Sequence, residues 1–173
     1  MAAVRGALRS ARIYSRSVMA RATLKSPMNP RPYVSSDHGE WLRMRLALWP
    51  EGTAETHLSD MTRWLARPDA VVLVAPHPQQ GRLVGFAEVG TRSVADSCET
   101  SPVAYLEGWY VDPEAQRQGV GAALIRAAED WARARGLREF ASDTQLNNLT
   151  SQRAHTALGF SEVERVVLYR KAL

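Results

Sequence analysis

The stretch Val111-Asp-Pro-Glu-Ala-Gln-Arg-Gln-Gly-Val-Gly121 decides the fold of this chain of 173 residues. It joins an apolar, strand-like run at residues 104–111 to a helix-like run at residues 122–135. Gly119 and Gly121 lie at the helix start, where the missing Cβ lets main-chain N–H groups approach a ligand. Unpaired N–H groups and the helix dipole favour an anion such as a pyrophosphate there. An ordinary helix start is the alternative, since the spacing fits neither the P-loop nor the dinucleotide fingerprint.

Periodicity predicts strands and helices in a mixed order along the chain. Helices are expected at residues 38–48, 56–65, 121–135 and 148–158, and strands at 33–35, 70–75, 82–91, 103–111 and 138–142. Residues 160–169 are apolar enough for a final strand pair or one bent strand. The length suits one domain. The expected fold class is therefore α/β, with a mixed central sheet flanked by helices on both faces.

Charge is distributed unevenly along the chain. Six of its 22 basic residues lie within residues 1–27, which contain no acid, so the remainder carries 16 basic against 18 acidic residues. This mildly acidic remainder favours a cationic substrate over a nucleic-acid partner. We expect residues 1–28 to be a basic extension, disordered or loosely helical, and residues 29–173 to be the functional domain. A transit peptide and a true translation start at Met28 both remain open for the extension.

Cys98 is the single cysteine, so no internal disulfide is possible and a reducing, cytoplasmic setting is expected. Nothing in its surroundings marks it as an activated nucleophile. No apolar run approaches the roughly 20 residues that span a bilayer, so no membrane partner is expected. We also expect no metal ion to take part.

Several motifs resemble one family of enzymes. Gln116-x-x-Gly119-x-Gly121 after a strand resembles the acyl-CoA signature of the GNAT N-acetyltransferases. Residues 98–111, 141–144, 155–160 and 164–171, with Leu48-Trp-Pro50, are similar to the aminoglycoside 6'-N-acetyltransferases of that superfamily. The resemblance covers residues 30 to 173. It implies transfer of acetyl from acetyl-CoA to the 6'-amine of an aminoglycoside antibiotic, resistance as the outcome, and a homodimer.

On the coenzyme side, main-chain N–H groups of the glycine turn are expected to hold the diphosphate, and the preceding strand to pair with the amide-bearing pantetheine arm. The residues expected there are Trp109, Tyr110, Val111, Gln116, Arg117, Gln118, Gly119, Val120, Gly121 and Ala122. Asn148 is predicted to cap the last helix. The resemblance also places it against the coenzyme arm.

Glu107 occupies the position of the general base in the related enzymes. An amine of pKa about 9 is only about 1% unprotonated at pH 7, so the reaction needs a proton acceptor. An isolated carboxylate is a weak base for this proton, and we predict that a water molecule relays the transfer. An ordinary strand carboxylate is the alternative. Without an activated nucleophile, transfer is expected to be direct, in a ternary complex.

His155 stands where many relatives carry a tyrosine that protonates the departing thiolate. This departure leaves the general acid open, because an imidazole can donate a proton but a thiolate also takes one from water.

Further side chains are candidates for binding a polycationic acceptor. A single exposed charge pair contributes about 1 kcal/mol at 4 Å in water, so several are needed for selectivity. The candidates are Glu88, on the strand before Glu107, and Asp143, at the end of the strand after it. Trp49, Glu51 and Glu99 are candidates for the remaining walls of the site. The carboxylates could equally be surface residues, and Trp49 could belong to the core. An acetyltransferase for another amine, such as a polyamine or a protein N-terminus, remains an alternative function, as does a non-catalytic acyl-CoA-binding module.

Overall fold

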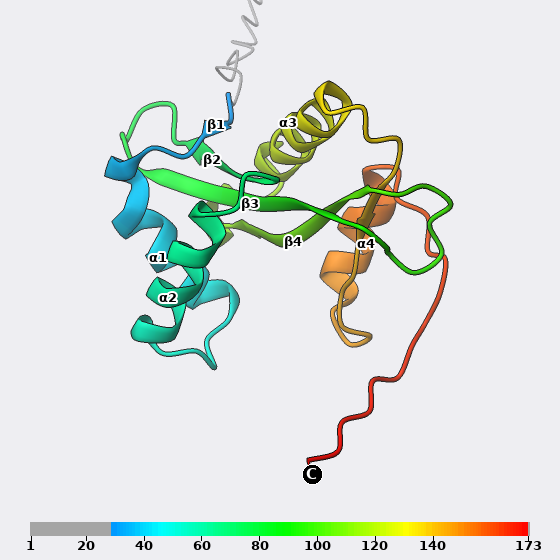
Figure 1. The fold of residues 1–173 in the computed structure, drawn as a ribbon. Coiled ribbons are helices and arrows are strands. Elements are labelled where there is room, and N and C mark those ends of the chain that lie inside the picture. The colour runs from blue at the N-terminus through cyan, green and yellow to red at the C-terminus, as the bar shows by residue number, and fades with distance from the viewer. Residues whose placement is uncertain (1–28, 173) are drawn as a thin grey trace, which may run out of the picture.

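The computed structural model describes residues 29–172, so the predicted basic extension lies outside the described residues. Its centre is a five-stranded sheet in the order β1-β2-β3-β4-β5 (Figure 1). The strands are β1 (Arg31–Pro32), β2 (Ala70–Pro76), β3 (Leu83–Arg92), β4 (Val103–Val111) and β5 (Phe140–Ser142). The first four pair antiparallel, and β5 runs parallel to β4. The expected mixed sheet is confirmed.

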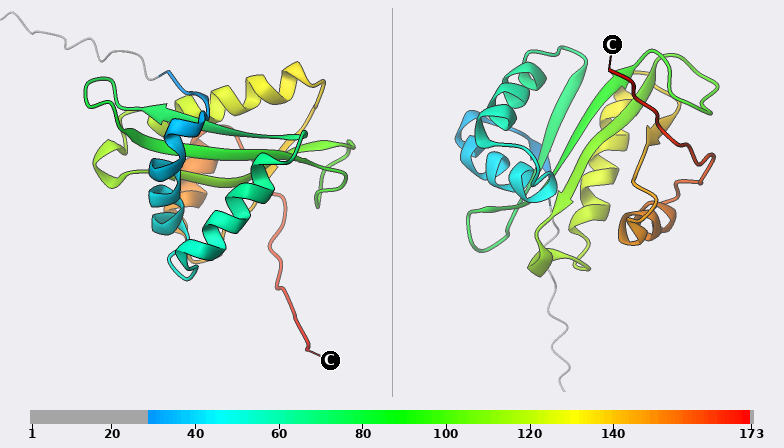
Figure 2. Two further views of the ribbon diagram at one scale, coloured as in Figure 1. Left: turned by 60° about the vertical axis from the view of Figure 1, so that its left-hand side comes forward. Right: turned by 90° about the horizontal axis from the view of Figure 1, so that it is seen from below.

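Helices cover both faces of the sheet, as Figure 2 shows. The four helices are α1 (His38–Leu48), α2 (Ala54–Leu65), α3 (Val120–Ala134) and α4 (Leu149–Ala157). On one face α1 and α2 bury Trp41, Met44 and Met61 against Phe86 of β3. On the other face α3 buries Leu124 and Ile125 against Val84 and Val89 of β3. The sheet therefore separates two apolar cores, which is what a mixed sheet with two apolar faces requires.

β4 contains a bulge and an open edge. Glu88 pairs with Gly108 and the next residue, Val89, pairs with Leu106, so Glu107 is the extra residue. β5 pairs only with residues 104–106 of β4. Within residues 29–172, the far half of β4 thus has no strand on its β5 side. A bulge re-aims side chains and an open edge exposes main-chain groups, and both occur here in one strand.

The first strand lies earlier than the sequence predicted. It covers Arg31–Pro32 instead of residues 33–35, and residues 35–37 form a short 3-10 helix, η1 (Ser35–Asp37). The reason is Asp37, whose carboxylate accepts a hydrogen bond from the Val34 N–H at 2.9 Å and is bound by the Arg31 guanidinium. These contacts turn the chain away from the sheet after Tyr33.

The predicted final strand is wrong for this chain on its own. Residues 161–172 have no secondary structure and lead away from the sheet in Figure 1. Val167 is 70% exposed and Leu168 91% exposed. The local sequence suits a strand, but no partner strand lies beside it in the described part of the chain.

Candidate active site

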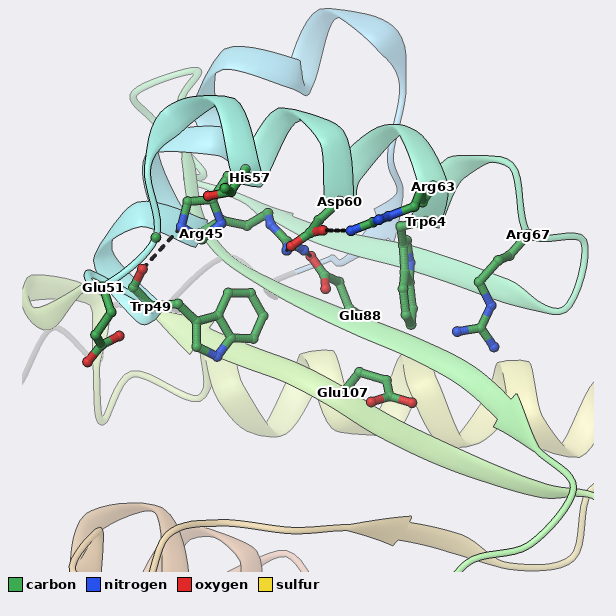
Figure 3. Close-up of a pocket in the computed structure, with 12 residues that line it drawn as sticks. Arg45, Trp49, Glu51, His57, Asp60, Arg63, Trp64, Arg67, Glu88 and Glu107 are labelled. Carbon is green, nitrogen blue, oxygen red and sulfur yellow. Dashed lines mark hydrogen bonds and ion pairs between the residues drawn. The ribbon is translucent and has the colours of Figure 1, made fainter. Parts of the chain in front are cut away.

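A cleft of about 640 Å³ lies between the α1–α2 pair and the sheet (Figure 3). Acidic side chains and arginines line this cleft. The acids are Glu51, Asp60, Glu88 and Glu107. The arginines are Arg45, Arg63 and Arg67. Trp49, Trp64 and His57 supply flat, apolar wall surface between them. The cleft can therefore offer charge and ring faces to the same ligand.

The β4 bulge places Glu107 in the wall of this cleft. Its side chain is 22% exposed, and both carboxylate oxygens accept hydrogen bonds from Arg92, from Nε at 2.8 Å and from Nη2 at 2.6 Å. The following Gly108 leaves room for a ring, since a Cβ there would lie 2.6 Å from Cη2 of Trp49. The bulge thus sets the predicted base beside an aromatic wall.

Glu88 lies at the floor of the cleft and already has protein partners. It is 3% exposed, accepts a hydrogen bond from Nε1 of Trp41 at 2.9 Å, and pairs with Arg45. Burial raises the pKa of Glu88, and the positive charge of Arg45 opposes that rise. The Arg45 guanidinium also lies 4.7 Å from the centroid of the Trp49 ring. The structure therefore gives Glu88 a part in fixing the cleft wall, and direct contact with an acceptor stays a prediction.

Asp143 is linked to Glu107 through two intervening side chains. The Tyr105 hydroxyl donates to Oδ1 of Asp143 at 2.5 Å, and the Arg92 guanidinium lies 3.3 Å from the Tyr105 ring centroid. Burial, with the hydrogen bond to Asp143, raises the pKa of Tyr105. Tyr105 therefore remains a hydroxyl donor at neutral pH. Asp143 and Glu99 are both exposed and lie outside the cleft lining, so their contact with an acceptor stays a prediction.

The glycine turn lies at the start of α3, as predicted. Gly119 caps the helix with φ of 87°, a left-handed conformation that glycine adopts without strain. Gly121 is needed for space, since a Cβ there would lie 2.8 Å from Cζ2 of Trp109. No side chain caps the first turn of α3. Its leading N–H groups are thus placed as an anion site would require.

Side-chain hydrogen bonds to the main chain hold the turn that precedes α3. Nε2 of Gln116 donates to the Val111 carbonyl at 3.2 Å, and Nε2 of Gln118 donates to the Glu114 carbonyl at 2.6 Å. Arg117 between them has φ of 56°, in the left-handed region. The two glutamines therefore shape the turn, whichever of these residues contacts a coenzyme.

His155 lies on α4 beside β4 and β5. Its Nδ1 is 2.8 Å from the Ser151 carbonyl oxygen, which can only accept, so Nδ1 carries the proton. Nε2 lies 3.0 Å from Oγ of Ser142 and, in the neutral ring, accepts from that hydroxyl. The ring packs edge-on against Trp109, with centroids 5.5 Å apart. Proton donation from Nε2 therefore requires the imidazolium form.

Asn148 caps α4 as predicted, since its Oδ1 accepts from the Ser151 N–H at 3.0 Å. Its contact with a coenzyme arm stays a prediction. Cys98 is a free thiol. Burial and the charges of Glu139 and Asp96 raise the pKa of Cys98, opposite to the shift that activates a thiol nucleophile.

Comparison with known proteins identifies the family of this chain. The acetyltransferase (GNAT) family model matches residues 39–160, which include the cleft, the β4 bulge and the glycine turn. The chain belongs to the GNAT acetyltransferase family. Among its relatives is an aminoglycoside N(6')-acetyltransferase type 1 of Klebsiella aerogenes, 52% identical over 147 residues, which are 83% of this chain and 95% of the relative. The enzyme of the same description from Serratia marcescens is 49% identical over 144 residues, covering 81% and 98% of the two chains.

Solved structures of similar proteins agree with the fold of this GNAT acetyltransferase. The aminoglycoside acetyltransferase AAC(6')-Iy, solved with the bisubstrate analogue CoA-S-monomethyl-acetylneamine, is 37% identical with a TM-score of 0.80, and the match covers 86% of this chain and all of that one. The apo 6'-N-acetyltransferase of Acinetobacter haemolyticus is 37% identical with a TM-score of 0.78, over 84% and 99% of the two chains.

Sequence reasoning missed several cleft residues of this GNAT acetyltransferase. The α2 side of the cleft consists of His57, Asp60 and Trp64, followed by Arg67 beyond the helix end. Their spacing of three and four residues is a helical stripe that could have been recognised. Arg92, which lies outside the cleft lining but binds Glu107, carried no such signal, because this contact depends on strand pairing.

Two kinds of feature are not found in residues 29–172 of the acetyltransferase. No three His, Cys, Asp or Glu side chains are grouped so that they could hold a metal ion. No helix there has the length and apolar character to cross a membrane.

Proposed function

We propose that this chain transfers the acetyl group of acetyl-CoA to the 6'-amino group of aminoglycoside antibiotics and thereby confers resistance. The observation that carries the proposal is the form of β4. Its bulge turns Glu107 into the charged cleft, and its open edge from residue 108 to residue 111 leads to the glycine turn of α3. This form of one strand supports an acceptor site next to a coenzyme site. The relatives named above carry the assignment of the 6'-amine.

On the coenzyme side, the leading N–H groups of α3 bind the diphosphate and the positive end of the helix dipole favours its charge. The open main chain of Trp109 to Val111 pairs with the amides of the pantetheine arm, as an added strand would. Arg117 supplies a cationic contact from the turn. These contacts would align the thioester beside Glu107.

On the acceptor side, an ammonium group must lose a proton before its nitrogen can attack. Glu107 takes that proton through a water molecule, and the freed lone pair attacks the acetyl carbonyl carbon. The new C–N bond forms, the C–S bond breaks with its electron pair staying on sulfur, and the nitrogen releases its second proton to water as the neutral amide forms. The thiolate takes its proton from the His155 imidazolium or from water. Because Cys98 is not activated, no acyl-enzyme intermediate is needed.

Acceptor profiling tests this function directly. Thiol release from acetyl-CoA should be measured with kanamycin and tobramycin, with congeners that carry a 6'-hydroxyl, and with simple amines. Turnover is expected for the first group only. Equal turnover of a polyamine or an N-terminal peptide would assign the enzyme to another acceptor class, and binding of acetyl-CoA without any turnover would contradict catalysis.

We also propose that the chain forms a homodimer through residues 161–172 and acts in the cytoplasm. Residues 161–172 have the composition of a strand, yet their apolar side chains are exposed and pair with nothing in the described part of one chain. A second copy would supply a strand partner and cover these side chains. The single free thiol agrees with a reducing compartment.

A further inference from the structure

Arg92, the last residue of β3, is the direct cationic partner of Glu107. Its Nε and Nη2 groups donate to the two oxygens of that carboxylate at 2.8 and 2.6 Å, a bidentate arrangement. We propose that Arg92 is a displaceable counter-ion of the acceptor cleft: its guanidinium holds Glu107 while no acceptor is bound, and the ammonium group of the acceptor displaces it. This inference rests on the proposed function, and it concerns a residue that neither the motifs nor the family assignment identifies.

Two Arg–Glu pairs each contribute a carboxylate to the cleft lining, and their environments differ. In the pair of Arg45 with Glu88, the side chains are 7% and 3% exposed, and Trp41 also donates to the carboxylate. Separating that pair would leave an uncompensated charge in the core, so it is permanent. In the pair of Arg92 with Glu107, the side chains are 41% and 22% exposed. Water and a ligand can reach the second pair, so it can be opened.

Arg92 also has few other contacts that would resist its displacement. In the described part of the chain, Glu107 is the one group that accepts hydrogen bonds from its guanidinium. Its guanidinium also lies over the face of the Tyr105 ring, whose hydroxyl is bound to Asp143. The charges of Glu107 and Asp143 both raise the pKa of Arg92. A guanidinium that leaves Glu107 therefore stays within the field of a second carboxylate.

The three arginines that line the cleft have other partners. Arg63 pairs with Asp60, and Arg67 is bound to Asp69 and to the Thr91 carbonyl. None of them donates to Glu107. Because Glu107 faces the cleft, an acceptor ammonium and the Arg92 guanidinium compete for one carboxylate. Such competition weakens acceptor binding without altering the bond-making step, and it should therefore raise KM and leave kcat unchanged.

Removing the competing cation tests the inference. Arg92→Ala should lower the KM for kanamycin, and its calorimetric Kd, by about fivefold, with kcat within about twofold of the unmodified enzyme. Arg92→Lys keeps the charge but not the bidentate geometry, so its KM should be intermediate. Low-millimolar guanidinium should raise the KM of Arg92→Ala towards that of the unmodified enzyme by filling the vacated position. Arg133→Ala removes the same charge from a surface ion pair on α3 and should change neither parameter.

A fall in kcat without a change in KM would show that Arg92 stays bound to Glu107 during the reaction. If kcat of Arg92→Ala falls more than about tenfold at unchanged KM, and guanidinium restores kcat, then Arg92 holds Glu107 throughout the reaction and the inference is wrong. An unchanged KM and Kd would also overturn it. The melting temperature and the acetyl-CoA affinity of each variant should be measured to show that the variant is folded. The outcomes remain separable from the proposed function, since failure of the unmodified enzyme to acetylate any aminoglycoside would contradict that function first.

Discussion

At the scale of single residues, the role of Glu107 depends on one irregularity in pairing. A regular β4 would alternate its side chains between the two faces, and Glu107 and Gly108 would face opposite cores. The bulge puts both on the cleft side, so the carboxylate and the space for Trp49 come from adjacent positions. Local sequence therefore determines which groups are present, whereas strand register determines where they point.

Replacement of Glu107 by glutamine separates a catalytic role from a binding role. The amide keeps the size of the side chain but cannot accept a proton, so kcat should fall about 100-fold while KM changes much less. Steady-state kinetics with kanamycin would measure both. Glu129→Gln, which changes a carboxylate on α3 away from the cleft, is the matched control. An unchanged kcat for Glu107→Gln would remove this residue from the mechanism.

At the scale of secondary-structure elements, much of the fold follows from local signals. The bounds of α1 and β4 are predicted to the residue, because apolar spacing is clear and Pro50, Pro102 and Pro113 interrupt the chain around them. The bulge could not be predicted, since it arises from the register between two strands. The position of residues 161–172 could not be predicted, because a strand-like composition does not show which strand the segment pairs with.

The first turn of α3 yields a test of the coenzyme site. Asparagine and aspartate are similar in size and both tolerate the left-handed conformation of residue 119, but only aspartate adds a negative charge. Gly119→Asp should therefore weaken acetyl-CoA binding at least about tenfold more than Gly119→Asn. Calorimetry with acetyl-CoA measures the difference. The same two changes at Gly136, another left-handed glycine at the far end of α3, should leave the affinity unchanged. Equal affinities for the two Gly119 variants would place the diphosphate elsewhere.

At the scale of the whole molecule, helices cover both faces of the sheet, whereas the apolar side chains of residues 161–172 remain exposed. Side chains such as Leu168 and Tyr169 are 91% and 92% exposed, in a region whose apolar composition suits a strand. Exposed apolar surface of this kind marks an interaction site. The cleft and the glycine turn are each formed by residues of one chain, so the proposed dimer is expected to affect stability more than chemistry.

The proposed dimer would have a solution mass of twice the 19.2 kDa chain. Light scattering after gel filtration should give that mass for the unmodified protein. Leu168→Lys should shift it to the monomer, because a charge placed in a strand interface must be desolvated. Leu58→Lys, at an exposed position of α2, makes the same chemical change outside the segment and should leave the dimer intact. Since Leu168 is 91% exposed in one chain, the variant should still fold and bind acetyl-CoA. A monomeric unmodified protein, or a Leu168→Lys variant that keeps the dimer mass, would mean that residues 161–172 do not join two copies.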